Sequence, residues 1–221
     1  MALPKPVEPL IVGIGGGASI GSSTDQALAL ALLEARRQGA QTIIFGGQAL
    51  AQLPLYLTPA ASASPGAKAL IDAIRSADGL IIASPGYHGS ISGAVKNAID
   101  YVEETSNDPR PYFSDLPVGL ITVASGHQAA VSTLLALRTI VHALRAWPTP
   151  FGAAINSVGG VFRDGVCTDE STRRHLDLVA TQVLQFATGV VAGNRASIAA
   201  TDGHERGDAA HIFAADSSRS R

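Results

Sequence analysis

The chain has 221 residues, 46% of them hydrophobic, which suits one domain with a sizeable core. Its formal net charge is −2 and its Lys and Arg residues form no extended cluster, so the composition gives no sign of a nucleic-acid-binding surface. The single cysteine, Cys167, excludes an internal disulfide and a cysteine-rich metal site, and we predict no bound metal.

Five short apolar segments alternate with five longer segments of helical periodicity. The predicted strands are residues 9–15, 42–47, 79–84, 117–125 and 151–156. The predicted helices are residues 22–38, 67–77, 92–103, 129–147 and 170–191. Parallel strands joined by helices require right-handed crossovers, which cover both faces of a sheet. We therefore predict a doubly wound α/β fold whose binding site lies in loops at the carboxyl ends of the strands.

The last part of the chain differs in composition from the rest. Residues 194–221 lose both periodicities and are richer in Ser, Asp and Arg. We predict that residues 1–193 form the folded domain and that residues 194–221 are a disordered tail. The N-terminus is Pro-rich and polar, and no run reaches the ~18 apolar residues of a membrane span, so we expect a soluble cytoplasmic protein without a membrane partner.

The first loop, GIGGGASIGSST (13–24), joins the first strand to the first helix, where backbone N–H groups and the helix dipole favour an anion. The Walker pattern fails there because Ser22 stands where its lysine should be. The dinucleotide pattern fits the glycines, but the acidic residue that it requires at the end of the second strand is absent. Neither pattern is therefore complete.

A phosphomonoester held by hydroxyls and backbone amides is the third interpretation of this loop. The predicted contacts are Ser19, Gly21, Ser22, Ser23 and Thr24. Because no Lys or Arg occurs between Lys5 and Arg36, such a phosphate would be neutralised by the helix N-terminus and by hydrogen bonds. The structural alternative is that Ser22 or Ser23 caps the helix, and both interpretations remain open.

A second loop follows the third predicted strand, in the segment SPGYHGSISGAVKNAIDY (84–101). Its proline fixes φ and its glycines permit tight or left-handed geometry, so the aromatic side chains between them are held at the crevice. Such a turn can lie along the edge of a flat aromatic ligand. The predicted contacts are Pro85, Gly86, Tyr87, His88, Gly89 and Ser90.

This segment resembles the T/S-P-x-Y-x-x-S-x-x-G-x-x-K-N-A-x-D motif of the NADPH-dependent FMN reductases, which are flavodoxin-like oxidoreductases. The matching residues are Ser84, Pro85, Tyr87, Ser90, Gly93, Lys96, Asn97, Ala98 and Asp100. The first loop and the segment LPLY (53–56) resemble that family too. Many members have an arginine where this chain has Ser19, and its absence is consistent with FMN acting as a dissociable substrate.

The resemblance implies a flavodoxin-like fold, with a five-stranded parallel sheet in the order 2-1-3-4-5 and helices on both faces. Residues 1–193 would then be an FMN-binding reductase domain. FMN would lie at the switch point, with its phosphate on residues 15–24 and its ring along residues 85–90. The other edge of the ring would meet the third loop, at Ser125, Gly126 and His127.

The resemblance also implies hydride transfer from NADPH, or NADH, to FMN, with no obligatory catalytic residue and with His88 as the candidate if one exists. Our leading expectation is an FMN reductase that supplies reduced flavin to a partner monooxygenase. One alternative keeps FMN bound and reduces quinones, azo dyes or metal oxyanions, and another is an FMN-binding electron-transfer module. The resemblance also implies a homodimer or homotetramer, in which helices 92–103 and 129–147 form the contact surfaces between subunits.

Overall fold

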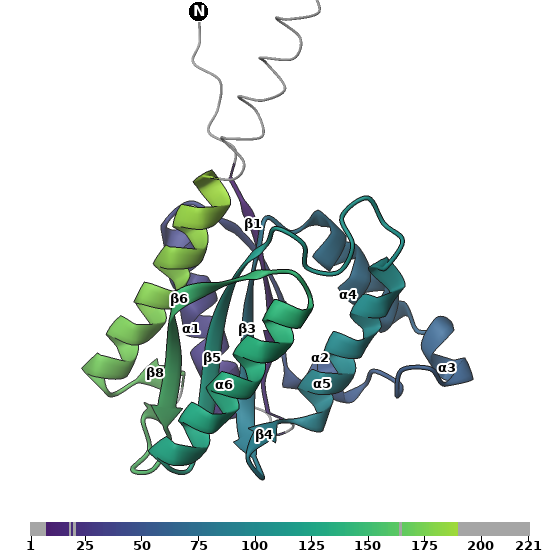
Figure 1. Ribbon diagram of the computed structural model, residues 1–221. Coiled ribbons are helices and arrows are strands. Elements are labelled where there is room, and N and C mark those ends of the chain that lie inside the picture. Colours follow the sequence, from purple (N-terminus) through teal and green to yellow (C-terminus); the bar gives the residue numbers. More distant parts are fainter. Residues whose placement is uncertain (1–7, 18, 20, 164, 190–221) are drawn as a thin grey trace, which may run out of the picture. The chain divides into compact units, whose positions relative to one another are not determined.

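The central sheet of the computed structural model has five parallel strands (Figure 1). In spatial order they are β2 (Gln41–Phe45), β1 (Leu10–Gly15), β3 (Gly79–Tyr87), β5 (Pro117–Ala124) and β6 (Trp147–Asn156). Numbered as five successive strands of the chain, this is the order 2-1-3-4-5. The predicted α/β fold and strand order are therefore confirmed.

The structure describes residues 8–189, except residues 18, 20 and 164. Residues 1–187 form one unit and a second unit begins at Thr188. The tail predicted over residues 194–221 lies outside the described residues, so the predicted domain boundary stays a prediction. Among the helices in the described part, none combines the length and apolar character needed to cross a bilayer.

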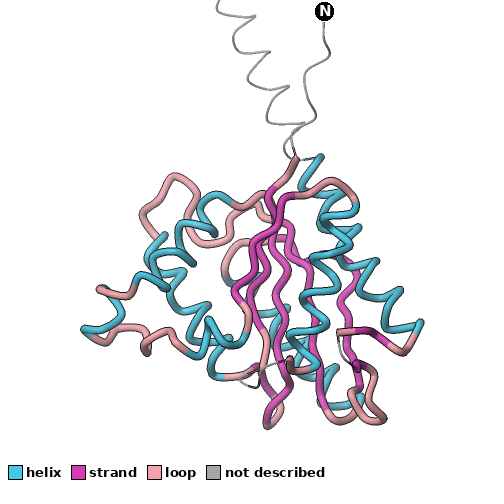
Figure 2. Tube along the Cα trace, turned by 180° about the vertical axis from the view of Figure 1, so that it is seen from behind, coloured by secondary structure: helices cyan, strands magenta, loops and turns pink. Residues whose placement is uncertain are grey.

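Helices cover both faces of the sheet, and Figure 2 shows them on either side of the strands. One face carries α1 (Ser23–Arg37) and the helix formed by residues 170–189. The other face carries α2 (Gly47–Ala51), α4 (Pro65–Ser76), α5 (Gly93–Asp100) and α6 (His127–Ala143). Two cores result, one on each face, because successive side chains of a strand point to opposite faces.

Glycines within the strands bring one helical layer close to the sheet. A Cβ atom at Gly13 would lie 2.5 Å from Cδ1 of Leu32 in α1. A Cβ atom at Gly119 would lie 2.6 Å from Cγ1 of Val179 in the helix formed by residues 170–189. Both positions lack room for a side chain, so these two helices pack directly on the strand backbones.

The predicted C-terminal end of the fourth helix, residue 147, was wrong. α6 ends at Ala143, and Arg145 follows with a φ of 68°. Its N–H donates to the carbonyl of His142 and the next N–H donates to that of Val141, which is the Schellman pattern of a helix end. Trp147 therefore begins β6, an edge strand. Its first half was not predicted as a strand because it contains two prolines.

Several short elements have no counterpart among the predicted ones. They are α2, α3 (Pro59–Ser62), β4 (Ser90–Ile91), the 3₁₀ segment η1 (Tyr101–Thr105) and a hairpin of β7 (Phe162–Arg163) and β8 (Val166–Cys167). Each has five residues or fewer, which is too short for a periodic pattern to emerge from sequence. Of these, β4 changes the description of the candidate site.

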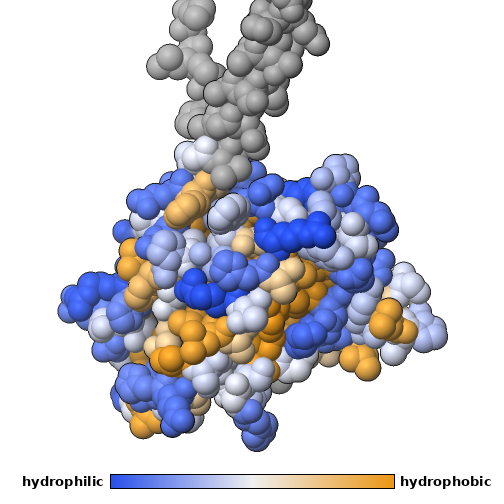
Figure 3. All heavy atoms as spheres, viewed as in Figure 1, coloured by the Kyte–Doolittle hydropathy of each residue, from blue (hydrophilic) through white to orange (hydrophobic). Residues whose placement is uncertain are grey.

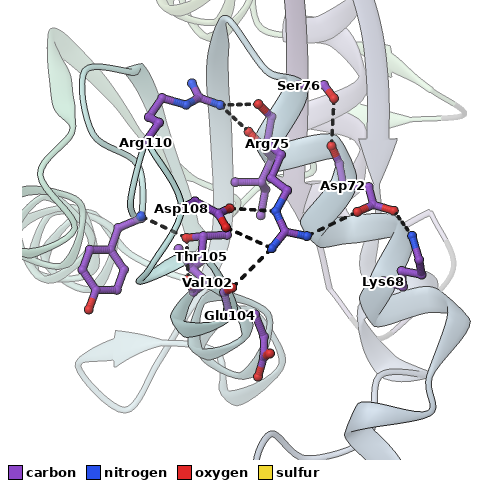
Figure 4. A network of polar contacts seen from close by, with 11 residues as sticks. Lys68, Asp72, Arg75, Ser76, Val102, Glu104, Thr105, Asp108 and Arg110 are labelled. Atoms are coloured by element: carbon purple, nitrogen blue, oxygen red, sulfur yellow. Dashed lines mark hydrogen bonds and ion pairs between the residues drawn. The ribbon is translucent and has the colours of Figure 1, made fainter.

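A polar network attaches the segment after α5 to α4 (Figure 4). Nε of Arg75 lies 2.7 Å from a carboxylate oxygen of Asp108, and Arg75 also pairs with Asp72 in its own helix. Arg110 donates to the carbonyl oxygens of Ile74, Arg75 and Ala77 and so caps the end of α4. Burial lowers the pKa of the Arg110 guanidinium. The network fixes the chain that leads into β5.

Candidate functional site

Three loops meet at the carboxyl ends of β1, β3 and β5, which point to the lower edge of Figure 1. Because these strands are parallel neighbours, the loops that follow them lie at one edge of the sheet. The N–H of Gly16, in the first loop, donates to the carbonyl of Ala83 in β3 over 3.2 Å. The structure thus brings together the three loops in which the site residues were predicted.

The first loop is closed by the side chain of Ser22, which is the N-cap of α1. Its Oγ accepts hydrogen bonds from the N–H groups of Gly17 (3.0 Å) and Asp25 (3.1 Å). The same hydroxyl donates to Oδ2 of Asp25 over 2.7 Å. The capping interpretation is therefore confirmed for Ser22, and the hydroxyl is engaged within the protein.

The other predicted contacts of this loop differ in exposure. Ser19 and Gly21 are exposed, Ser23 is half-buried, and Thr24 is 3% exposed. Ser23 and Thr24 begin α1, and the N–H groups of a first helical turn have no acceptor inside the helix. An anion at this end of α1 would thus meet two backbone donors and the hydroxyls of Ser19 and Ser23.

Sequence reasoning missed Asp25, whose carboxylate connects the loops after β1 and β2. Its Oδ1 accepts a hydrogen bond from the N–H of Gly47, at the start of α2, over 2.8 Å. A hollow of about 330 Å³ opens beside it, lined by Gly21, Asp25, Gly46, Gly47, Gln48 and Ala49. The spacing of Ser22 and Asp25 is that of a capping box, a signal that could have found it.

The second loop is a β-hairpin, since β3 continues beyond the sheet and pairs with β4. Pro85 and Gly86 lie in β3, so the prediction that the strand ends at residue 84 was wrong. His88 and Gly89 form the turn with φ values of 50° and 83°, as a two-residue type I′ turn requires. Tyr87 is 53% exposed, and His88 and Ser90 are exposed beside it.

The base of this hairpin is fixed by buried contacts. Oγ of Ser84 accepts a hydrogen bond from the N–H of Ser92 and donates to the carbonyl of Pro85. Ser92 in turn caps α5. A Cβ atom at Gly86 would lie 2.7 Å from Oγ1 of Thr133, so β3 touches α6 there without room for a side chain. The hairpin therefore presents its exposed residues from a fixed base.

The third loop leads from the carboxyl end of β5 into the N-terminus of α6. Gly126 is the N-cap, with a φ of 126°, and the side chains of Ser125 and His127 are exposed on either side of it. The N–H of Gly126 donates to Oδ1 of Asn156, at the end of β6, over 2.9 Å. Sequence reasoning missed Asn156, although a polar residue that ends an apolar strand is a usable signal.

Asn97, one of the motif residues, organises the segment LPLY. Its Nδ2 donates to the carbonyl of Pro54, and its Oδ1 accepts from the N–H of Tyr56. The hydroxyl of Tyr101 donates to the same carbonyl over 2.8 Å. Burial, followed by the hydrogen bond to Glu104, raises the pKa of Tyr56. Two of the three segments that carry the resemblance, residues 84–101 and LPLY, are thus joined by hydrogen bonds.

A further cavity lies away from the strand ends, between α3, α4 and η1. It has a volume of about 540 Å³, and Tyr56, Lys68 and Tyr101 are among its lining residues. None of the predicted site residues lines it. Across the described residues there is also no cluster of His, Cys, Asp and Glu that could hold a metal ion.

Residues 9–159 match the model of the family described as NADPH-dependent FMN reductase. An NADPH azoreductase of Bacillus sp. (strain OY1-2) is 33% identical over 87 residues, which are 39% of this chain and 46% of the relative. An FMN-dependent NADPH-azoreductase of Staphylococcus aureus (strain USA300) is 40% identical over 83 residues, 38% of this chain and 40% of the relative. The chain thus matches less than half the length of these curated relatives.

Solved structures agree with the fold. The apo form of an NADH:FMN oxidoreductase (EMOB) superposes with a TM-score of 0.59 and 20% sequence identity, over 82% of this chain and 89% of that one. At this identity the likeness supports the fold alone. Since the family model spans more than half of the chain, from the first strand to the end of the fifth, the chain belongs to the NADPH-dependent FMN reductase family.

Proposed function

We propose that the chain is an NAD(P)H-dependent FMN reductase whose flavin site is the crevice between the first loop and the β3–β4 hairpin. The observation that carries the proposal is the position of these two elements, which follow neighbouring strands at the switch point of the sheet. One offers the N-terminus of a 15-residue helix to a phosphate, and the other offers an exposed aromatic edge to a flat ring.

The described residues suit the two ends of FMN in different ways. The hydroxyls of Ser19 and Ser23 and the first-turn N–H groups of α1 would hold the phosphate. Tyr87 and the backbone of residues 85–90 would border the ring, with Ser125 and His127 at its other edge. When bound, FMN supplies the ring atom that accepts a hydride from the nicotinamide.

The protein's share of the reaction is orientation. The hairpin leaves Tyr87, His88 and Ser90 exposed, so a nicotinamide ring can approach the flavin from the solvent side. His88 lies in the turn of the hairpin and His127 is the first residue of α6, and both exposed side chains would line the site. We assign no obligatory proton transfer to them, and proton donation by His88 remains the alternative.

We propose release of reduced FMN to a partner monooxygenase as the physiological use of the reaction. The first loop contains no Lys or Arg, and its Ser22 hydroxyl is engaged in capping. Both features limit the number of groups that hold the phosphate. A site with few phosphate contacts suits a flavin that arrives and departs with each turnover.

A second candidate retains FMN and passes its electrons to azo dyes or quinones. The names of the two curated relatives, both azoreductases, favour it. The two candidates differ in whether flavin stays with the protein through purification.

The visible spectrum of the purified protein, followed by NADPH oxidation with and without added FMN, tests the proposal. We expect a colourless protein whose oxidation of NADPH depends on added FMN. A yellow protein that oxidises NADPH only when an azo dye or quinone is added would support the second candidate. Flavin binding without NADPH oxidation would reject both and indicate an electron-transfer module. NADH in place of NADPH gives the nucleotide preference in the same assay.

A further inference from the structure

The phosphate end of the proposed flavin site contains a carboxylate. Asp25 is the third residue of α1, next to the first-turn N–H groups that an anion would use. Its two oxygens contact the Ser22 hydroxyl and the Gly47 N–H at 2.7 and 2.8 Å. The residue also lines the hollow beside Gly21, so its charge faces the space next to the loop.

No positive side chain from the loop offsets this charge. The chain has no Lys or Arg between Lys5 and Arg36, and no ion pair of Asp25 occurs among the described residues. A phosphate monoester carries a charge of about −1.5 to −2 at neutral pH. A phosphate at the start of α1 would therefore be repelled by Asp25 at a distance of one helical turn or less.

Asp25 also removes a donor. The Ser22 hydroxyl has one proton, and that proton is directed at Oδ2 of Asp25. Oγ of Ser22 also accepts hydrogen bonds from the N–H groups of Gly17 and Asp25, which use both of its acceptor positions. As long as the carboxylate is in place, Ser22 cannot donate to a phosphate.

We propose that Asp25 is a specificity-determining residue that weakens the binding of the flavin phosphate. The inference rests on the proposed flavin site. The repulsion acts on the phosphate and leaves the ring contacts unchanged, so the site distinguishes FMN from riboflavin less than a site with a cationic loop would. Ready release of FMN follows from the same charge.

The experiment compares dissociation constants for FMN and riboflavin, measured by flavin fluorescence, in the wild type and in Asp25→Asn. The amide removes the charge, keeps an acceptor for the Gly47 N–H and frees the Ser22 proton. We expect FMN to bind on the order of tenfold more tightly in the variant and riboflavin to bind as before. Asp25→Ser, which is smaller, should act in the same direction.

Glu34→Gln is the matched control. It removes one carboxylate from the same helix, about 13 Å further along its axis, where Glu34 contacts Arg37. At that distance screening by salt makes the charge ineffective at the loop, so neither dissociation constant should change. Thermal unfolding of each variant verifies that it is folded.

Two results would overturn the inference while the flavin site stands. One is an unchanged or weaker FMN affinity in Asp25→Asn with riboflavin affinity unaltered, since it would mean that Asp25 organises the loop for the phosphate. The other needs no variant: a wild type that prefers FMN over riboflavin by about a thousandfold or more has strong phosphate contacts. A wild type that binds neither flavin would instead reject the proposed function.

Discussion

Ser22 combines three hydrogen bonds in one hydroxyl, two accepted from backbone N–H groups and one donated to a carboxylate. Through them the glycine-rich segment after β1 is attached to the first turn of α1. The neighbouring Ser23 is the first residue of the helix and is half-buried, and among the described residues the side-chain hydrogen bonds that close the loop are made by Ser22 and not by Ser23. Two adjacent serines therefore have separable roles.

Replacement of Ser22 by Ala should lower the free energy of unfolding by about 1 kcal/mol, because an N-cap side chain is lost. Ser23→Ala should change it little, and it serves as the control for the loss of a hydroxyl in this loop. Chemical denaturation monitored by circular dichroism measures both. Equal losses in the two variants would contradict the assignment of Ser22 as the capping residue.

At this scale the sequence predicts which residues lie at the strand ends and fails to predict how they are connected. The hydroxyls of the first loop and the exposed Tyr87 follow from motif and turn chemistry. Asp25, Asn97 and Asn156 act through hydrogen bonds to backbone groups 22, 41 and 30 residues away. Partners so distant in the chain become neighbours only after the strands have assembled.

Among the elements, the β3–β4 hairpin has a turn that requires an unusual backbone conformation. Its turn needs positive φ at two consecutive positions, and only Gly89 satisfies this without steric cost. His88 adopts a φ of 50° with a Cβ atom present. The geometry of the exposed edge therefore depends on one glycine.

Gly89→Val should distort the turn at a cost on the order of 1–3 kcal/mol, because a β-branched residue is strongly disfavoured at positive φ. We expect weaker binding of both FMN and riboflavin, since the ring end of the site is altered. Gly89→Asn is the control, as asparagine tolerates positive φ, and it should bind both flavins normally. Fluorescence titration decides, and unchanged affinities in Gly89→Val would separate the hairpin from the flavin site.

The sequence predicts which long elements are helices and which are strands, because each has the hydrophobic periodicity of its type. The five strands and five helices follow from apolar runs and helical faces, whereas the first half of β6 was hidden by Pro148 and Pro150. The hairpin was read as a tight turn because a Pro-Gly pair usually ends a strand. Here Pro85 stays in register with Val123 of β5, and pairing with a neighbour overrides the local preference.

For the whole molecule, we propose that α6 forms a contact between two copies of the chain. Apolar side chains gather over α6 on the face drawn in Figure 3. Val131 and Leu135, on its outer surface, are 47% and 60% exposed. A helix with this much apolar surface at the edge of the candidate site suits the homodimer that the family resemblance implies.

Leu135→Glu should separate such a dimer into single chains, because it places a charge on the apolar surface. Leu33→Glu is the matched control, since Leu33 is 47% exposed on α1, which covers the other face of the sheet. Light scattering coupled to size-exclusion chromatography gives the mass of each. A wild type that already elutes as one chain, with no change in Leu135→Glu, would rule out this contact.

β3, the strand that carries the hairpin, is bordered by β1 and β5 over most of its length. Because the hairpin continues a strand that is paired on both sides, it has little freedom to move relative to the sheet. A flavin ring would bind there to a preorganised surface, and no conformational change of the hairpin would be needed. Diffusional encounter would then set the rate of arrival, and the residence time would depend on departure alone.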